Sequence, residues 1–219
     1  MLISHKHKFI VVNIPKTGTR SLRETLTAIG AIDFTGGQKP IKGSSLWQHT
    51  TSFKAKAELE YWDEYFKYTT VRNPWDRYIS LFSYWKGKAS DYKKNAIPPH
   101  PGAMNQGKHA ARLFEGRSDA ELLAALIGSS PSQDKYFTDA NKSVIVDHIA
   151  RLEKVNDEFN FLCDKVGINS PVKLNHSNKS KKQIGIGDLY TQELIDMVAE
   201  KESVVISLKN YTFAGRKIK

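Results

Sequence analysis

Cysteine is almost absent from this sequence, since Cys163 is the only one among 219 residues. A single thiol cannot build a disulfide framework or a zinc site made of cysteines, so both are excluded. Cys163 also lies in an apolar pattern with helical spacing, which is typical of a core helix. We therefore expect a buried structural cysteine and not a nucleophile.

Long hydrophobic runs are absent as well. The apolar stretch near the N-terminus covers only residues 9–14, whereas a membrane-spanning helix needs about 20 apolar residues. No small-residue cleavage site precedes the basic loop that follows, so the stretch is not typical of a signal peptide. We expect a soluble, cytoplasmic protein without a transmembrane segment.

Acidic residues are fewer than basic ones, with 23 Asp and Glu against 33 Lys and Arg and a net charge of +10. Such a charge attracts anions at long range, whether they are nucleic acids, acidic glycans or nucleotides. Hydrophobic residues make up 40% of the chain, which is typical of a globular protein, and the length suffices for one good core. We predict a single domain over residues 1–219.

Predicted strands alternate with predicted helices along the chain. Apolar and β-branched residues predict strands at residues 9–14, 65–71 and 142–149, and Leu22 and Leu26 repeat at helical spacing after the first strand. This alternation predicts an α/β fold with a mainly parallel sheet covered by helices on both faces. Ligands are expected at the carboxyl ends of the strands.

The remaining segments are predicted from their turn and cap residues. Residues 86–109 are basic and contain three prolines, so we expect a surface loop there. A helix is predicted to start after Asn73, with Pro74 in its first position and Asp76 in its first turn. Ser118 and Glu121 form a capping box before an apolar run. Two further helices are predicted at about residues 151–166 and 191–208.

A first candidate site is PKTGTRS, residues 15–21, which joins the first strand to the first helix. The N–H groups of such a loop and of the helix start converge on an anion, and Lys16 adds a full charge. Gly18 allows close backbone approach. Three hydroxyls supply more donors, those of Thr17, Thr19 and Ser21. The stretch lacks the spacing of a Walker A loop, and an ordinary strand-to-helix turn is the alternative.

A second candidate site follows the strand at residues 65–71, in the stretch TTVRNPWDRYISLFSYW. Arg72 stands at the strand end and Ser80 on the next helix, where a guanidinium and a hydroxyl could share a phosphate. Two separate anion sites predict a ligand phosphorylated at both ends. The alternative is that Arg72 pairs with Asp76 while Ser80 faces solvent.

Four stretches together resemble a known family: VNIPKTGTRSL, WQHTTSF, FKYTTVRNPWDRYISLFSYW and VDHIARLEKVNDEF. They are similar to the sulfotransferases that use 3′-phosphoadenosine 5′-phosphosulfate (PAPS), in particular the carbohydrate sulfotransferase branch. The resemblance implies a three-layer P-loop-like fold. It also implies that the first motif binds the 5′-phosphosulfate, through Lys16, Thr17, Gly18, Thr19, Arg20 and Ser21. The second motif would bind the 3′-phosphate, through Arg72 and Ser80.

One position departs from the pattern of that family, which usually has a threonine or another small residue where Arg20 stands. Arg20 either clamps the cofactor or points into solvent. Glu153 matches an acidic position of the family, but a carboxylate at a helix start explains it equally well. Its role stays open.

The resemblance also implies a reaction, the in-line transfer of a sulfuryl group from PAPS to a hydroxyl, with adenosine 3′,5′-bisphosphate (PAP) as the product. Positioned cations and amides provide most of the catalysis in such displacements, so Lys16 is expected to stabilise the departing phosphate oxygen and no metal is expected. A histidine, with an ordinary pKa of about 6.5, suits the general base. The resemblance places that base at His49, for which a structural role is the alternative.

A late polar stretch, KLNHSNKSKK, has two interpretations. It is either a solvated charge run or a lid over the cofactor. The lid would reach the phosphates with Lys179, Ser180 and Lys181.

The favoured function is therefore sulfuryl transfer from PAPS to a carbohydrate or related acceptor, with no nucleic-acid partner. A kinase with a variant phosphate loop is one alternative, although the Walker A spacing is missing. A non-catalytic polyanion-binding protein is the other, because the net charge permits it. The identity of the acceptor and the oligomeric state stay open.

Overall fold

The computed structural model describes residues 1–35, 45–94, 101–169, 174 and 189–213. The chain divides into two compact units, each made from two segments of sequence. Unit 1 comprises Met1–Asn73 with Pro131–Ser180, and unit 2 comprises Pro74–Ser130 with Lys181–Lys219. The single domain expected from the length stays a prediction.

Unit 1 is built on a five-stranded sheet with the order β3-β1-β2-β4-β5. Its strands are β1 (Leu2–Ser4), β2 (Phe9–Val12), β3 (Phe34–Thr35), β4 (Phe66–Val71) and β5 (His148–Arg151). The pairs β2–β4 and β4–β5 are parallel, whereas β1 runs antiparallel to both β2 and β3. Four of the five strands therefore point the same way, which confirms the predicted α/β fold with a mainly parallel sheet.

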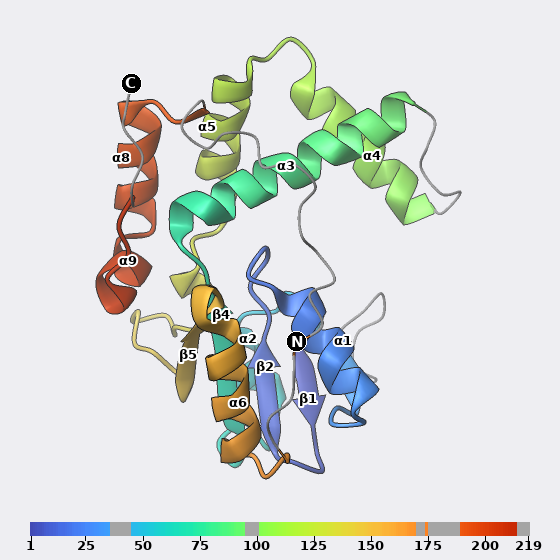
Figure 1. Cartoon of the computed structure of the whole chain (residues 1–219), viewed down its shortest axis with the longest axis vertical. Coiled ribbons are helices and arrows are strands. Elements are labelled where there is room, and N and C mark those ends of the chain that lie inside the picture. The colour runs from blue at the N-terminus through green and yellow to red at the C-terminus, as the bar shows by residue number, and fades with distance from the viewer. Residues whose placement is uncertain (36–44, 95–100, 170–173, 175–188, 214–219) are drawn as a thin grey trace. The chain divides into compact units, whose positions relative to one another are not determined.

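Helices lie on both faces of this sheet. A buried cluster joins Phe9, Val11 and Tyr68 of the sheet to α1 (Thr19–Ala28) and α6 (Val155–Lys165). The alternate residues of the strands point to the opposite face, since side chains alternate along a strand. Figure 1 shows α6 in front of the sheet and α2 (Ser52–Glu58) behind it.

Cys163 belongs to the same buried cluster, on α6. Burial raises the pKa of its thiol to about 11. A thiol with a raised pKa is a poor nucleophile at neutral pH, so the prediction of a structural cysteine is confirmed.

The third strand lies further along the chain than predicted, at His148–Arg151 instead of residues 142–149. Its apolar neighbours Val144 and Ile145 pair with residues 137–138 in a local turn. Asp139 fixes that turn, because its carboxylate accepts the backbone N–H groups of residues 141 and 143. The short strands β1 and β3 are absent from the prediction.

Unit 2 is helical in its described residues. Its helices are α3 (Pro74–Lys93), α4 (Pro101–Phe114), α5 (Asp119–Ser129), α8 (Gln192–Lys201) and α9 (Ser203–Lys209). Helix α3 contacts α4, α5 and α8. None of the described helices combines the length and the hydropathy that a crossing of the membrane requires.

Two helix starts in unit 2 agree with the sequence. Pro74 occupies the first position of α3 and Asp76 its first turn. The predicted capping box is present, since the Ser118 hydroxyl accepts the N–H of Glu121 and the Glu121 carboxylate accepts the N–H of Ser118. These local signals specify where α3 and α5 begin.

The surface loop predicted at residues 86–109 is wrong for residues 86–93 and 101–109, and residues 95–100 lie outside the described residues. Helix α3 continues to Lys93, and α4 begins at Pro101. Proline is tolerated in the first turn of a helix because its missing N–H would have no helical partner there. Pro101 therefore stands at the start of a helix.

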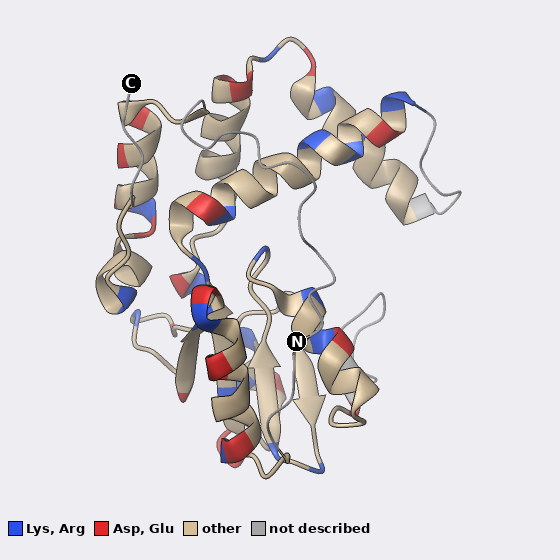
Figure 2. Ribbon diagram, viewed as in Figure 1, with Lys and Arg blue, Asp and Glu red and all other residues tan. Residues whose placement is uncertain are grey.

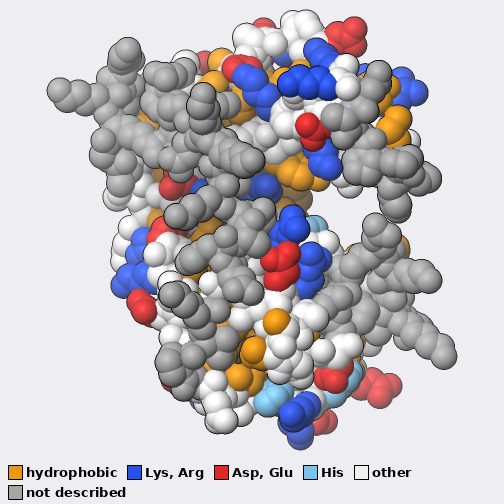
Figure 3. Space-filling view, turned by 45° about the vertical axis from the view of Figure 1, so that its right-hand side comes forward, with side chains coloured by type: hydrophobic (Ala, Val, Ile, Leu, Met, Phe, Trp, Pro, Cys, Tyr) orange, Lys and Arg blue, Asp and Glu red, His pale blue; other side chains and the backbone are white. Residues whose placement is uncertain are grey.

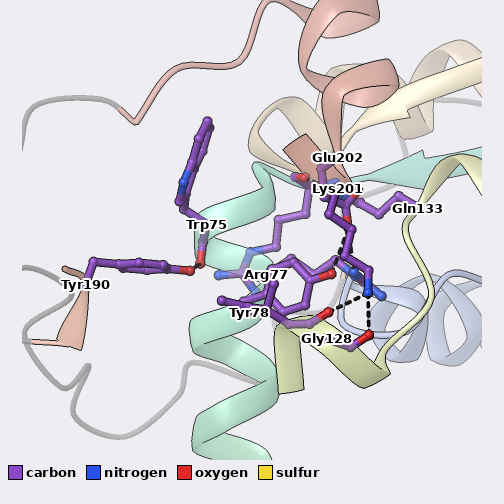
Figure 4. Close-up of polar contacts among 10 residues, drawn as sticks. Trp75, Arg77, Tyr78, Gly128, Gln133, Tyr190, Lys201 and Glu202 are labelled. Carbon is purple, nitrogen blue, oxygen red and sulfur yellow. Dashed lines mark hydrogen bonds and ion pairs between the residues drawn. The ribbon is translucent and has the colours of Figure 1, made fainter. Parts of the chain in front are cut away.

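A buried ion pair holds α3 to the junction of α8 and α9 (Figure 4). Arg77 Nη1 donates to Glu202 Oε1 at 2.9 Å, and the Tyr78 hydroxyl donates to the same oxygen at 3.2 Å. All three side chains are almost wholly buried. Nearby, Lys201 Nζ donates to the Gly128 carbonyl at 2.8 Å and so joins α8 to α5. The region predicted as one helix at residues 191–208 is thus two helices that meet at Glu202.

Candidate active site

Three parallel strands of unit 1 end at the same edge of the sheet. Because β2, β4 and β5 point the same way, the segments that follow them lie together at their carboxyl ends. These segments are residues 13–18 after β2, Arg72 with Asn73 after β4, and η2 (Leu152–Lys154) after β5. This edge carries four of the predicted site residues, Lys16, Thr17, Gly18 and Arg72, and α1 begins beside it with Thr19, Arg20 and Ser21.

The loop after β2 depends on a glycine. Gly18 has a φ of +79° and is the N-cap of α1. A Cβ at this position would lie 2.5 Å from Cδ1 of Leu152, so no other residue fits without a shift. Gly18 has no side chain that could cap the first turn of α1, and that turn holds no acidic residue. The start of α1 therefore suits an anion, which would meet its N–H groups and the positive end of the helix dipole.

Lys16 and Arg72 bring two positive charges to this edge. Arg72 Nη1 donates to the Lys16 carbonyl oxygen at 3.5 Å, so the second motif reaches the first. Burial, and after it the charge of Arg72, lowers the pKa of Lys16 from 10.5 to about 8. Figure 2 shows a basic residue at the tip of the loop that joins β2 to α1. An anion bound here would relieve the repulsion between the two cations.

The other residues of the first motif have different surroundings. Thr17 is buried, and its hydroxyl donates to the carbonyl of Ile14 at 3.0 Å. Arg20 is exposed over 62% of its side chain, and its Nε donates to Glu24 Oε1 at 2.7 Å. In this structure Arg20 therefore pairs along the surface of α1. Thr19 and Ser21 lie half-buried in the first turn of α1.

His49 lies against the strand end of β2. Its ring Nδ1 is 2.9 Å from the carbonyl oxygen of Asn13, the residue that follows β2. The segment around His49 also forms one wall of a shallow cavity of about 420 Å³. The cavity is lined by Ser45, Trp47, Gln48, His49, Thr50, Thr51 and Lys54.

Two residues of this edge were missed or left open by the sequence analysis. Gln133 is wholly buried and forms hydrogen bonds with both backbone groups of Arg72. Glu153, whose role was open, accepts the backbone N–H of Asn73 at 2.7 Å. Nothing in the sequence around Gln133 signals this contact, because it joins residues 61 positions apart.

The structure does not test the placement of four predicted site residues. Ser80 lies half-buried on α3 in unit 2, so its part in a shared phosphate site with Arg72 stays a prediction. The proposed lid residues Lys179, Ser180 and Lys181 lie outside the described residues. Within the described ranges, no group of three or more His, Cys, Asp and Glu side chains could hold a metal ion.

Comparisons with known proteins identify the family. The sequence model of the sulfotransferase family matches residues 1–115, which is more than half of the chain and includes Lys16, Gly18, His49 and Arg72. The chain therefore belongs to the sulfotransferase family. This confirms the family predicted from the sequence and supports a transferase of sulfuryl groups.

Comparison with curated protein sequences gives no match. Among solved structures, the chain is similar to the crystal structure of a sulfotransferase from Alicyclobacillus acidocaldarius, with 12% sequence identity and a TM-score of 0.42. The similarity covers 94% of this chain and 97% of that one.

Proposed function

We propose that this protein transfers the sulfuryl group of PAPS to a hydroxyl of a carbohydrate or a related acceptor, with His49 as the general base. The observation that carries the proposal is the hydrogen bond between His49 Nδ1 and the Asn13 carbonyl. It places an imidazole beside the strand end from which the anion-binding loop begins.

The bond to Asn13 determines which ring nitrogen of His49 can act as a base. A carbonyl oxygen only accepts hydrogen bonds, so Nδ1 must carry the hydrogen. In the neutral ring Nε2 then holds the lone pair, which is the form that a general base needs. Nε2 would take the proton of the acceptor hydroxyl as its oxygen attacks the sulfur. The carbonyl would meanwhile stabilise the imidazolium that forms.

The residues of the loop fit a phosphosulfate donor. PAPS supplies the activated sulfuryl group, whose bond to the 5′-phosphate oxygen breaks as the bond to the acceptor oxygen forms. The backbone of the loop at Gly18 and the start of α1 would hold the phosphosulfate. Lys16 would neutralise charge on the departing phosphate oxygen, and its pKa of about 8 leaves it mostly protonated at neutral pH. Arg72, with Ser80, would bind the 3′-phosphate.

The cavity beside His49 supports a ring-shaped acceptor. Trp47 is 47% exposed and lines this cavity together with His49. An exposed indole offers an apolar face of the size of a sugar ring, and Thr51 and Lys54 add polar groups that can orient hydroxyls. This combination favours a carbohydrate over a purely apolar acceptor.

The two alternative functions receive less support. Membership of the sulfotransferase family argues against a kinase. On the face drawn in Figure 3, the visible Lys and Arg side chains stand among acidic and apolar ones. Membership of an enzyme family also argues against a non-catalytic polyanion binder. The cytoplasmic location and the lack of a nucleic-acid partner stay predictions.

The test is the transfer of labelled sulfate from PAPS to a panel of carbohydrate and phenol acceptors. Wild-type protein should label at least one carbohydrate, and His49→Ala should lower the rate by about 10²–10⁴-fold, the usual contribution of a general base. PAP binding should survive the substitution, because His49 does not hold the donor.

His7→Ala is the matched control. His7 Nδ1 also contacts a carbonyl, that of Val166 at 3.2 Å, but His7 precedes β2 and so lies at the opposite edge of the sheet. Its loss should leave transfer unchanged. Normal turnover in His49→Ala, or equal losses in the two variants, would contradict the assignment of His49.

A further inference from the structure

Gln133 makes an unusual pair of hydrogen bonds with the backbone of Arg72. The Arg72 N–H donates to Gln133 Oε1 at 2.9 Å, and Gln133 Nε2 donates to the Arg72 carbonyl at 3.0 Å. The Gln133 side chain is wholly buried, with 0% exposure. A buried amide whose donor and acceptor both bind one residue fixes the backbone of that residue in position.

The place of Arg72 explains why such a contact is needed. The strand β4 ends at Val71, whose partner in β5 is Arg151. Arg72 is the first residue beyond this ladder, and the Gln133 amide takes the position that a neighbouring strand would occupy. The side chain thus extends the ordered backbone of β4 by one residue.

Only glutamine combines the length and the polar groups required. Asparagine is shorter by one methylene, and an ionised glutamate at residue 133 could accept the Arg72 N–H but would repel its carbonyl. Glu153 secures the next residue, since its carboxylate accepts the Asn73 N–H. Gln133 and Glu153 therefore hold consecutive peptide groups on each side of the Arg72 side chain.

We propose that Gln133 is a positioning residue that sets the preference of the donor site for a 3′-phosphate by holding the backbone of Arg72. The inference rests on the proposed function, in which Arg72 binds that phosphate. Gln133 itself does not touch the ligand. Its effect should therefore appear with nucleotides that carry a 3′-phosphate and not with those that lack it.

The test compares the dissociation constants of two nucleotides, PAP and adenosine 5′-monophosphate (AMP), which differ by the 3′-phosphate. Wild-type protein should bind PAP much more tightly. Gln133→Met keeps the side-chain length but loses both hydrogen bonds, and should reduce the preference for PAP by about tenfold. AMP binding should change little. Gln192→Met, on an exposed residue of α8, should leave both constants unchanged.

A double-mutant cycle separates positioning from a general structural effect. If Gln133 acts through Arg72, then Gln133→Met should not reduce the PAP preference any further in an Arg72→Ala background. If Gln133→Met reduced the PAP preference as much in the Arg72→Ala background as in wild-type protein, the proposal would be overturned. A folded Gln133→Met variant with the wild-type preference for PAP would overturn it as well. A wild-type protein with no preference for PAP would instead contradict the proposed function itself.

A second variant covers the case in which Gln133→Met does not fold. Gln133→Glu preserves the shape and one acceptor, and should also weaken PAP selectively. Unfolding of both variants would overturn the proposal, because Gln133 would then serve the whole fold and not the placement of Arg72.

Discussion

Replacing Gly18 with alanine is expected to lower the free energy of unfolding by about 2–5 kcal/mol. Two separate costs make up this value. An L-residue with φ near +79° costs about 1–2 kcal/mol. A Cβ 2.5 Å from Leu152 Cδ1 forces the leucine to move, and overpacking of this kind costs about 1–3 kcal/mol.

Gly30 provides the control that separates the two costs. It also has a positive φ, +64°, but a Cβ there would meet nothing within 4 Å. Gly30→Ala should therefore cost only the backbone term, about 1–2 kcal/mol. The difference between the unfolding free energies of the two variants measures the contact between Gly18 and Leu152 of η2.

Urea unfolding, monitored by circular dichroism, gives the free energies of unfolding of both variants. Adding Leu152→Ala to Gly18→Ala should recover the packing part of the loss but leave the backbone part. If Gly18→Ala were no less stable than Gly30→Ala, Leu152 would not lie against the loop as described, and the geometry of the anion site would be wrong.

Three further predictions address the other groups. Because the pKa of Lys16 is lower in the folded protein, the unfolded chain binds more protons than the folded one between pH 8 and 10.5. Lys16 should therefore make the free energy of unfolding rise with pH over that range. Urea titrations of Lys16→Met should lack this rise. Arg77→Ala removes the ion-pair partner of the buried Glu202 and should lower the free energy of unfolding by about 3–5 kcal/mol, whereas the double variant Arg77→Met with Glu202→Leu should recover most of the loss in urea unfolding. Trp47→Ala should raise the KM for a carbohydrate acceptor but leave that for PAPS unchanged; equal rises in both would contradict an acceptor role.

The parts of the fold that the sequence predicted are those that local chemistry specifies. The buried run before PKTGT predicts β2, and Pro74 with Asp76 predicts the start of α3, because both signals act over a few residues. The same holds for the capping box of α5. The strands β1 and β3 have only three and two residues, so neither shows a period that a sequence pattern could reveal.

The motifs of the candidate site could be predicted from the sequence, but the contacts that position their residues could not. Lys16 and Gly18 lie in a short segment whose composition suggests an anion site, Arg72 follows the end of a predicted strand, and the resemblance to a family added His49. The contacts that place these residues are long-range. Gln133 reaches Arg72 across 61 positions, and His49 reaches Asn13 across 36, so no local pattern contains them.

The most direct test of the central claim is the thermal stabilisation of the protein by PAP compared with ATP. At a PAP concentration of 100 times its Kd, ligand binding contributes about 2.7 kcal/mol to stability. For a chain of this size, that corresponds to a rise in Tm of about 5–11 °C. ATP at the same concentration should raise the Tm far less, and Arg72→Ala should remove most of the difference. Equal shifts with PAP and ATP in the wild-type protein would contradict a donor site built for a 3′-phosphate.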